Sequence, residues 1–154
     1  MRGYTLVELL VVLAVLGLLA TMAMPLAELT VQREKERELK RALWEIRDAI
    51  DAYQRARAAG AIAAEPGRSQ YPPDLLALTQ AWPDARAERR SEVLRFLRRV
   101  PRDPFADPAL PPEASWGLRS YLSDAERPQP GADVYDVYSR SARPGLNGVP
   151  LKDW

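Results

Sequence analysis

Glu8 is the ionisable residue whose position in the sequence most clearly needs a chemical partner. It lies directly before the run from Leu9 to Ala20, which contains no polar side chain. A carboxylate inside a membrane costs up to about 3 kcal/mol on insertion scales. Unless Glu8 simply extends to the membrane interface, it therefore needs a cation close by, such as an amino group.

The composition leaves few other residues that could do chemistry. The chain has 154 residues, with 22 basic and 21 acidic side chains and neither histidine nor cysteine. These absences remove the usual general base near neutral pH, the thiol nucleophile, thiolate metal ligands and disulfides. We therefore expect no enzyme. A single-pass membrane enzyme with a carboxylate site is the alternative, and no motif in the sequence supports it.

Arginines are concentrated in the segment from Arg86 to Arg102, where seven of them occur. A basic patch with an interleaved aromatic residue could bind phosphate backbones. The helical spacing of Val93, Leu94 and Leu97 favours instead a helix with the arginines on its exposed side. The nearly balanced total charge also gives no support for a general attraction to nucleic acid, so no nucleic-acid partner is expected.

A long apolar helix must position Glu8. Thr21 is the sole polar side chain between Leu9 and Ala27, and a helix over 4–24 would be about 30 Å long, the hydrocarbon thickness of a bilayer. A secretory signal peptide is the alternative, but the residues after Thr21 match a small-residue cleavage site only weakly. We predict a membrane-spanning half of the helix over 4–27.

Pro25 lies near the end of this predicted span. Because proline lacks a backbone N–H group, it predicts a kink or a locally melted stretch between Ala23 and Leu29. The alternative is that Pro25 simply ends the span.

The segment 28–60 predicts a second, amphipathic half of the same helix, ended by Gly60 and then by Pro66 and Gly67. Its apolar residues recur at spacings of three and four, which places them on one stripe that a core must cover. The stripe consists of Leu39, Leu43, Ile46, Ile50 and Tyr53. The charged residues expected to face outward are Arg33, Glu34, Lys35, Glu36, Arg37, Glu38 and Lys40.

The segment 61–154 predicts a small globular region with short helices, one of them within Tyr71–Leu78, and a small sheet. Two aromatic segments, Trp116–Leu122 and Asp133–Ser139, are joined by a loop rich in proline and glycine, which predicts an antiparallel pair of strands. The fold class is therefore α+β, with the sheet packed on the long helix. The residues expected to cover the stripe are Trp116, Leu118, Val134 and Tyr138.

The sequence from Gly3 to Leu13, Gly-Tyr-Thr-Leu-Val-Glu-Leu-Leu-Val-Val-Leu, resembles the prepilin signature of type IV pilins and type II secretion pseudopilins. The resemblance implies a pilin-like fold, a leader over 1–3, cleavage by a prepilin peptidase between Gly3 and Tyr4, and N-methylation of Tyr4. It also implies that Glu8 neutralises the Tyr4 amino group of a neighbouring subunit during assembly, and that Pro25 corresponds to a proline common in the family.

The C-terminal region is similar to G-type major pseudopilins in its Pro101–Phe105 turn, its two strands and its closing loop, which ends in Trp154. In that group the closing loop holds calcium. Here the resemblance leaves Asp136 and Asp153 as weak calcium candidates, because Asp153 is the one acid among three basic residues of the loop. No other cofactor is expected.

The resemblance implies a subunit of a type II secretion system, built into a periplasmic pseudopilus filament that drives protein export. Its partners would be prepilin peptidase, identical and related pseudopilins, the inner-membrane secretion platform, the assembly ATPase and inner-membrane lipid. The chain would cross the bacterial inner membrane once, with the C-terminal domain in the periplasm. This orientation comes from the resemblance, since the basic residues after the span favour the opposite one. A minor type IV pilus pilin, used in adhesion, motility or DNA uptake, is the alternative.

Overall fold

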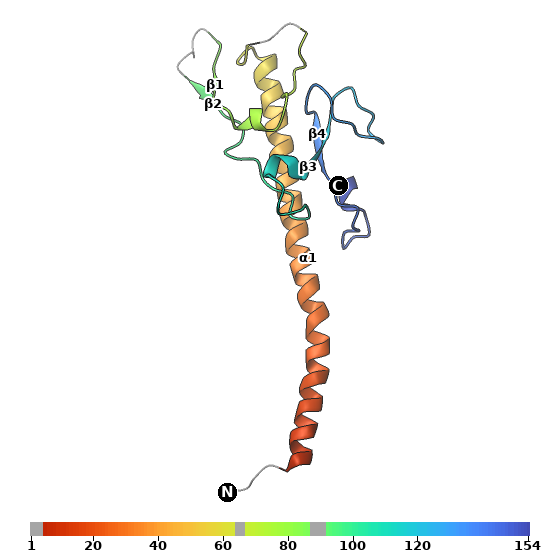
Figure 1. Cartoon of the computed structure of the whole chain (residues 1–154). Helices are drawn as coiled ribbons and strands as arrows, with labels where there is room; N and C mark the ends of the chain where they lie inside the picture. The colour runs from red at the N-terminus through yellow and green to blue at the C-terminus, as the bar shows by residue number, and fades with distance from the viewer. Residues whose placement is uncertain (1–4, 64–66, 87–91) are drawn as a thin grey trace. The chain divides into compact units, whose positions relative to one another are not determined.

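The structure is a computed structural model that describes residues 5–63, 67–86 and 92–154, and for residues 21–26 the backbone alone. The chain divides into two compact units, the first ending at Lys35 and the second running from Glu36 to Trp154. Figure 1 shows the order of the elements, from the long helix α1 to the short strands β1 to β4.

Helix α1 spans Leu6–Ala58 and confirms the predicted long N-terminal helix. Thr5 begins it, because its hydroxyl Oγ1 accepts a hydrogen bond of 3.3 Å from the backbone N–H of Glu8. Gly60 ends it with a positive φ of 71°. The N–H of Ala61 then bonds the carbonyl of Ala56 at 2.8 Å, as in a Schellman motif.

Pro25 lies inside α1, which is unbroken from Leu6 to Ala58. The locally melted stretch that was expected between Ala23 and Leu29 is therefore wrong, whereas a kink at Pro25 and the end of the membrane span at Pro25 stay predictions. Proline removes one hydrogen-bond donor, and the backbone on both sides keeps its helical conformation.

In the first unit, the large apolar side chains along α1 are exposed. They are Leu6, Val7, Leu9, Leu10, Val11, Val12, Leu13, Val15, Leu16, Leu18, Leu19, Leu29 and Val31. Within the described residues, we find no helix with both the length and the apolar composition needed to cross a membrane.

The second unit is built on the predicted stripe of α1, all of which is buried. Tyr53 is 1% exposed and packs edge-on against the rings of Trp82 and Phe96, with centroids 5.6 and 5.5 Å away. Burying one large apolar side chain contributes roughly 1.5–3 kcal/mol, so this stripe is a main source of stability. The other large buried members of the core are Ile62, Leu75, Leu78, Leu97, Val100, Trp116, Val134, Val137 and Leu151.

Strand β3 (Trp116–Arg119) pairs antiparallel with β4 (Asp136–Ser139) beside the C-terminal part of α1 (Figure 1). In this register Trp116 lies opposite Ser139 and Leu118 opposite Val137. The predicted pairing is confirmed, although both strands are shorter than expected.

Tyr138 does not cover the stripe as predicted, because side chains alternate along a strand and Val137 takes the inward position. Tyr138 instead lies on the other face of the sheet, over Gly117. A Cβ atom added at Gly117 would overlap the Tyr138 ring. The glycine therefore makes room for the aromatic ring on its cross-strand neighbour.

The helix predicted within Arg86–Arg102 is wrong for the residues that are described there; residues 87–91 lie outside them. Strand β2 (Val93–Leu94) pairs antiparallel with β1 (Trp82–Pro83). After β2 and Arg95, the N–H groups of Phe96 and Leu97 both donate to the carbonyl of Leu78, at 3.2 and 2.9 Å. An apolar run as short as this one fits the periodicity of a helix and that of a strand equally well. In the structure it is extended at β2, and the backbone after β2 bonds Leu78 instead of continuing as a helix.

The described part of the second unit also contains three short 3₁₀ helices: η1 (Leu76–Thr79), η2 (Pro112–Ser115) and η3 (Leu151–Asp153). Within η1, the N–H of Ala77 donates to the Asp74 carboxylate at 2.7 Å, which confirms a short helical segment within Tyr71–Leu78. The indole of Trp82 donates in turn to the Ala77 carbonyl at 2.8 Å. These bonds attach β1 to η1.

Candidate functional site

The candidate site at the start of the chain consists of Glu8 and the residues before it. Glu8 is exposed in the first turn of α1. The predicted processing residues, Gly3 and Tyr4, lie outside the described residues. A carboxylate in the first turn is favoured by the partial positive charge of the helix N-terminus, typically by 0.3–1 kcal/mol. Glu8 thus has a local stabilising interaction with the helix in addition to any role between chains.

Thr5 is the residue of this site that sequence reasoning missed. It is the N-cap of α1, and Glu8 is its third helical residue. The signal was present in the sequence, since a threonine followed three positions later by a glutamate is the capping-box pattern. By beginning the helix, Thr5 places the Glu8 carboxylate in the first turn of α1.

Comparison with known protein families shows what this segment is. Residues 1–24 match the family described as the prokaryotic N-terminal methylation motif. The methylation motif includes Gly3, Tyr4 and Glu8 and ends one residue before Pro25. It is a type IV pilin-like prepilin signal, which implies processing by prepilin peptidase and assembly with other pilin-type subunits. No curated protein and no solved structure matches the chain.

Asp136, one of the two calcium candidates, is bound by an arginine. Its Oδ1 accepts hydrogen bonds of 2.8 Å from Arg47 Nε and from the N–H of Val137. Arg47 Nη2 also donates to the carbonyl oxygens of Val137 and Trp154, at 3.1 and 3.0 Å. One guanidinium on α1 therefore binds both β4 and the closing loop.

The donor set around the two candidates does not fit calcium. Asp136 and Asp153 line one surface hollow together with a third acid, Glu126, and four cations, which are Arg47, Arg119, Arg127 and Lys152. Calcium takes six to eight oxygen ligands, and four cations against three carboxylates would repel it. Among the residues that the structure describes, no group of three or more acidic side chains could hold a metal ion.

Glu36 is the outward-facing charge whose predicted position is wrong. It is 8% exposed, and its carboxylate accepts a 2.8 Å hydrogen bond from the N–H of Leu146 in the closing loop. Leu39 follows Glu36 at a spacing of three residues, so Glu36 lies at the edge of the buried stripe. The bond to the loop offsets part of the cost of burying its charge.

Hydrogen bonds within the loop fix its shape. The N–H of Gly145 donates to the carbonyl of Val149 at 2.9 Å, and that of Gly148 donates to the carbonyl of Gly145 at 2.9 Å. The Trp154 indole also donates to Val149, at 3.3 Å, and Lys40 Nζ lies 4.5 Å from the centre of the Trp154 ring. These contacts, together with Arg47 and Glu36, fix the loop through the chain's own residues.

Two buried carboxylates that the sequence analysis did not single out also bind loops. Asp103 is 1% exposed and accepts hydrogen bonds from the Phe105 N–H at 2.8 Å and from the Ser139 hydroxyl at 2.6 Å. Asp133 is 5% exposed and accepts from the Ser120 hydroxyl at 2.6 Å and from the Tyr121 N–H at 2.9 Å. The Asp-Pro-Phe sequence was the available signal at Asp103, since aspartate often bonds the backbone two residues on.

Hydrogen bonding favours the charged form of Asp133. Burial raises the pKa of this carboxyl, but hydrogen bonds from Ser120, from Ser69 and from the backbone of Tyr121 outweigh burial and lower the pKa below 3.8. Asp133 is therefore an ionised structural acceptor at neutral pH.

Proposed function

We propose that this chain is a pseudopilin subunit of a type II secretion system. In this proposal prepilin peptidase cuts between Gly3 and Tyr4 and methylates Tyr4, while the segment 4–27 anchors the chain in the bacterial inner membrane. An assembly ATPase and the inner-membrane secretion platform then move the chain into a periplasmic filament that drives protein export. The observation that carries the proposal is the methylation motif over residues 1–24.

The chemistry of assembly follows from Glu8 and the apolar side chains after it. Cleavage before Tyr4 creates a new amino group, and methylation leaves its positive charge in place. An exposed Glu8 on a neighbouring copy can accept a charge-assisted hydrogen bond from that group. The exposed apolar side chains of α1 supply the lateral packing that holds neighbouring helices together.

The Pro101–Phe105 turn and the closing loop favour a pseudopilin over a type IV pilus pilin in this proposal. The Pro101–Phe105 turn is bonded through Asp103 to Ser139 at the end of β4. The loop ending in Trp154 is bound to Arg47 of α1. Both features belong to the part of the sequence that resembles G-type pseudopilins. We propose that Arg47 provides the attachment that calcium provides in that group.

Processing is tested with a Gly3→Ala variant of the full-length chain. We expect intact-mass spectrometry of the wild-type membrane fraction to find a chain that begins at Tyr4 and carries one added methyl group. The variant should retain residues 1–3 and lack the methyl group, because the peptidase requires glycine before the cleaved bond. Deleting the gene should also stop the export of secreted proteins.

Gly17→Ala is the matched control. A Cβ at Gly17 meets no heavy atom within 4 Å, so this variant should be processed like the wild type. A wild-type chain that retains Met1 in cells with an active prepilin peptidase would contradict the proposal.

A further inference from the structure

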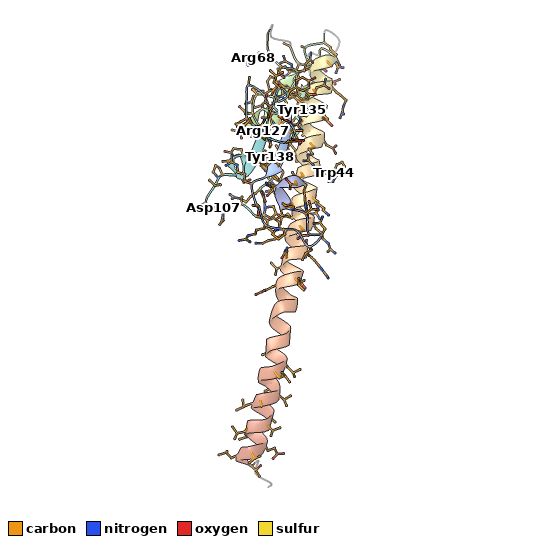
Figure 2. All side chains as sticks on the ribbon, turned by 90° about the vertical axis from the view of Figure 1, so that its right-hand side faces the viewer. Trp44, Arg68, Asp107, Arg127, Tyr135 and Tyr138 are labelled. Carbon is orange, nitrogen blue, oxygen red and sulfur yellow. The ribbon has the colours of Figure 1, made fainter. Side chains whose placement is uncertain are left out.

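The surface hollow lined by Asp136 and Asp153 does not fit calcium, but its lining fits a ligand of the opposite charge. The hollow lies in the second unit, between the end of β3, the loop before β4, β4 itself and the closing loop, and its volume is about 590 Å³. Figure 2 shows two of its residues, Arg127 and Tyr138, on the side of α1 away from Trp44. We refer to it as the closing-loop hollow.

The charges around the closing-loop hollow leave an excess of cations. Arg47 is bound to Asp136, so these two charges offset each other. The side chains that remain are three cations and two acids, which are Arg119, Arg127, Lys152, Glu126 and Asp153. Within the described parts of the chain, none of these five side chains has an ion pair or a hydrogen bond. The hollow therefore has a net charge of +1, and its cations are available to a ligand.

Arg119 is the cation of the hollow that most clearly needs an acceptor. Its Cζ atom lies 5.3 Å from the centre of the Tyr135 ring, and its Nε atom is buried without a hydrogen-bond partner. A guanidinium has five N–H donors and does not lose its proton in proteins, so the ring contact alone leaves these donors unsatisfied. A carboxylate beside Arg119 would accept charge-assisted hydrogen bonds, which are roughly twice as strong as neutral ones.

The size and the mixed chemistry of the hollow favour a peptide over a bare anion. Its volume is typical of sites for organic ligands and is far larger than one phosphate group. Tyr138 and Trp154 give it two aromatic walls. The carboxylates of Glu126 and Asp153 repel a dianion, but they can accept hydrogen bonds from backbone N–H groups. A short peptide with one acidic side chain matches all of these features.

We propose that the closing-loop hollow binds an acidic peptide segment of another protein. The carboxylate of the peptide is held by Arg119, Arg127 and Lys152, and an apolar residue beside it packs on Tyr138 and Trp154. The Trp154 wall is already fixed by the hydrogen bonds of its carbonyl and its indole, so binding has to order little of the closing loop. The proposal does not depend on the proposed function, because the whole hollow lies in the second unit.

Two blocked tripeptides test the carboxylate on the full-length chain in detergent. The probe is acetyl-Ala-Glu-Leu-amide, and acetyl-Ala-Gln-Leu-amide is its neutral analogue. The readout is the indole N–H resonance of Trp154 in the NMR spectrum, with Trp44 on the other side of α1 as the reference. We expect the acidic peptide to shift the Trp154 resonance with a dissociation constant on the order of 1 mM, and the analogue to bind at least about fivefold more weakly. Equal binding of both peptides, or no shift at all, would overturn the proposal.

Substitution of exposed cations shows whether the peptide binds in this hollow. Arg127 and Lys152 are exposed, so Arg127→Gln and Lys152→Gln should leave the fold intact. Each should weaken binding of the acidic peptide at least about threefold, because it removes one of the cations that attract the carboxylate. Arg95→Gln is the matched control, since Arg95 is exposed but does not line the hollow. Unchanged binding by both hollow variants would overturn the proposal, and so would an equal loss in the control.

Inorganic phosphate distinguishes a peptide site from a general anion site. We expect phosphate to bind more weakly than the acidic peptide and not to displace it at equal concentration. Phosphate lacks the apolar contacts with Tyr138 and Trp154, and the carboxylates of Glu126 and Asp153 repel its second charge. Phosphate that binds as tightly as the peptide and displaces it would overturn the proposal in favour of a site for bare oxyanions.

Discussion

Asp133 illustrates how a single carboxylate can fix a loop without being a catalytic group. It joins Ser120 and Tyr121, at the end of β3, to the segment that leads into β4. Removing one partner of a buried hydrogen bond leaves the others unsatisfied, at a cost of about 1–3 kcal/mol. We expect Asp133→Asn to lower the free energy of unfolding by that amount at neutral pH, measured by denaturant titration in detergent and compared with the exposed Asp107→Asn.

The pH dependence of the same residue has a definite sign. Because hydrogen bonds lower the Asp133 pKa below its ordinary value of 3.8, the charged form is stabilised in the folded chain. This contribution is complete above about pH 4 and disappears as the pH falls through the lowered folded pKa. The stability difference between wild type and Asp133→Asn should therefore shrink in acid. A difference that grows as the pH falls would contradict the assignment.

The role of Arg47 in place of a metal ion in the closing loop can be tested directly. It donates to Asp136, Val137 and Trp154, and none of these bonds involves a cation other than the guanidinium. We expect Arg47→Gln to destabilise the fold by about 1–3 kcal/mol, because one neutral side chain cannot replace the forked donors. Thermal unfolding of the wild type should have the same midpoint in calcium as in a chelator. A midpoint raised by calcium would contradict this account.

At the scale of elements, β3 and β4 depend on a glycine and an aromatic residue that lie across from each other. A Cβ at Gly117 would overlap the ring of Tyr138, so Gly117→Ala should destabilise the fold by about 1–3 kcal/mol. Gly117→Ala/Tyr138→Ala should cost less than the sum of the two single changes, because the second change makes room for the first. Denaturant unfolding of the four chains measures this coupling, and strict additivity would show that the contact is absent.

The sequence predicted those elements whose pattern is long or chemically marked. The stripe from Leu39 to Tyr53 repeats often enough to define one helical face, and Gly60 marks where that helix ends. The antiparallel pairing of β3 with β4 followed from two aromatic segments around a turn, whereas their register came from the structure. The Thr5 cap was also readable, but its pattern was overlooked.

Other elements depended on partners that are distant in the sequence. The sequence does not indicate a strand at Val93 and Leu94, because this strand and its partner β1 have only two residues each. The burial of Glu36 depends on a hydrogen bond from the N–H of Leu146. The position of the Arg47 side chain depends likewise on its hydrogen bond to the Asp136 carboxylate. Local periodicity contains no information about such contacts.

At the scale of the whole molecule, the chain combines two units with different chemistry. The first unit exposes apolar side chains within and after the methylation motif, and the second has its own core on α1. In the proposed filament, the first unit would pack with neighbouring copies through these apolar side chains. Glu8 connects this arrangement to processing, because the amino group it would bind exists only after cleavage.

The Glu8→Ala variant tests this central claim most directly. Losing a charge-assisted hydrogen bond of about 1.5–3 kcal/mol should reduce incorporation roughly tenfold to one hundredfold. The variant should still be cleaved before Tyr4, as should the Gly17→Ala control, since the peptidase acts on the bond after Gly3. The measurement is the amount of processed chain in sheared filaments relative to the membrane. The account predicts processed chain in the membrane and almost none in filaments, and normal filaments from Glu8→Ala would contradict it.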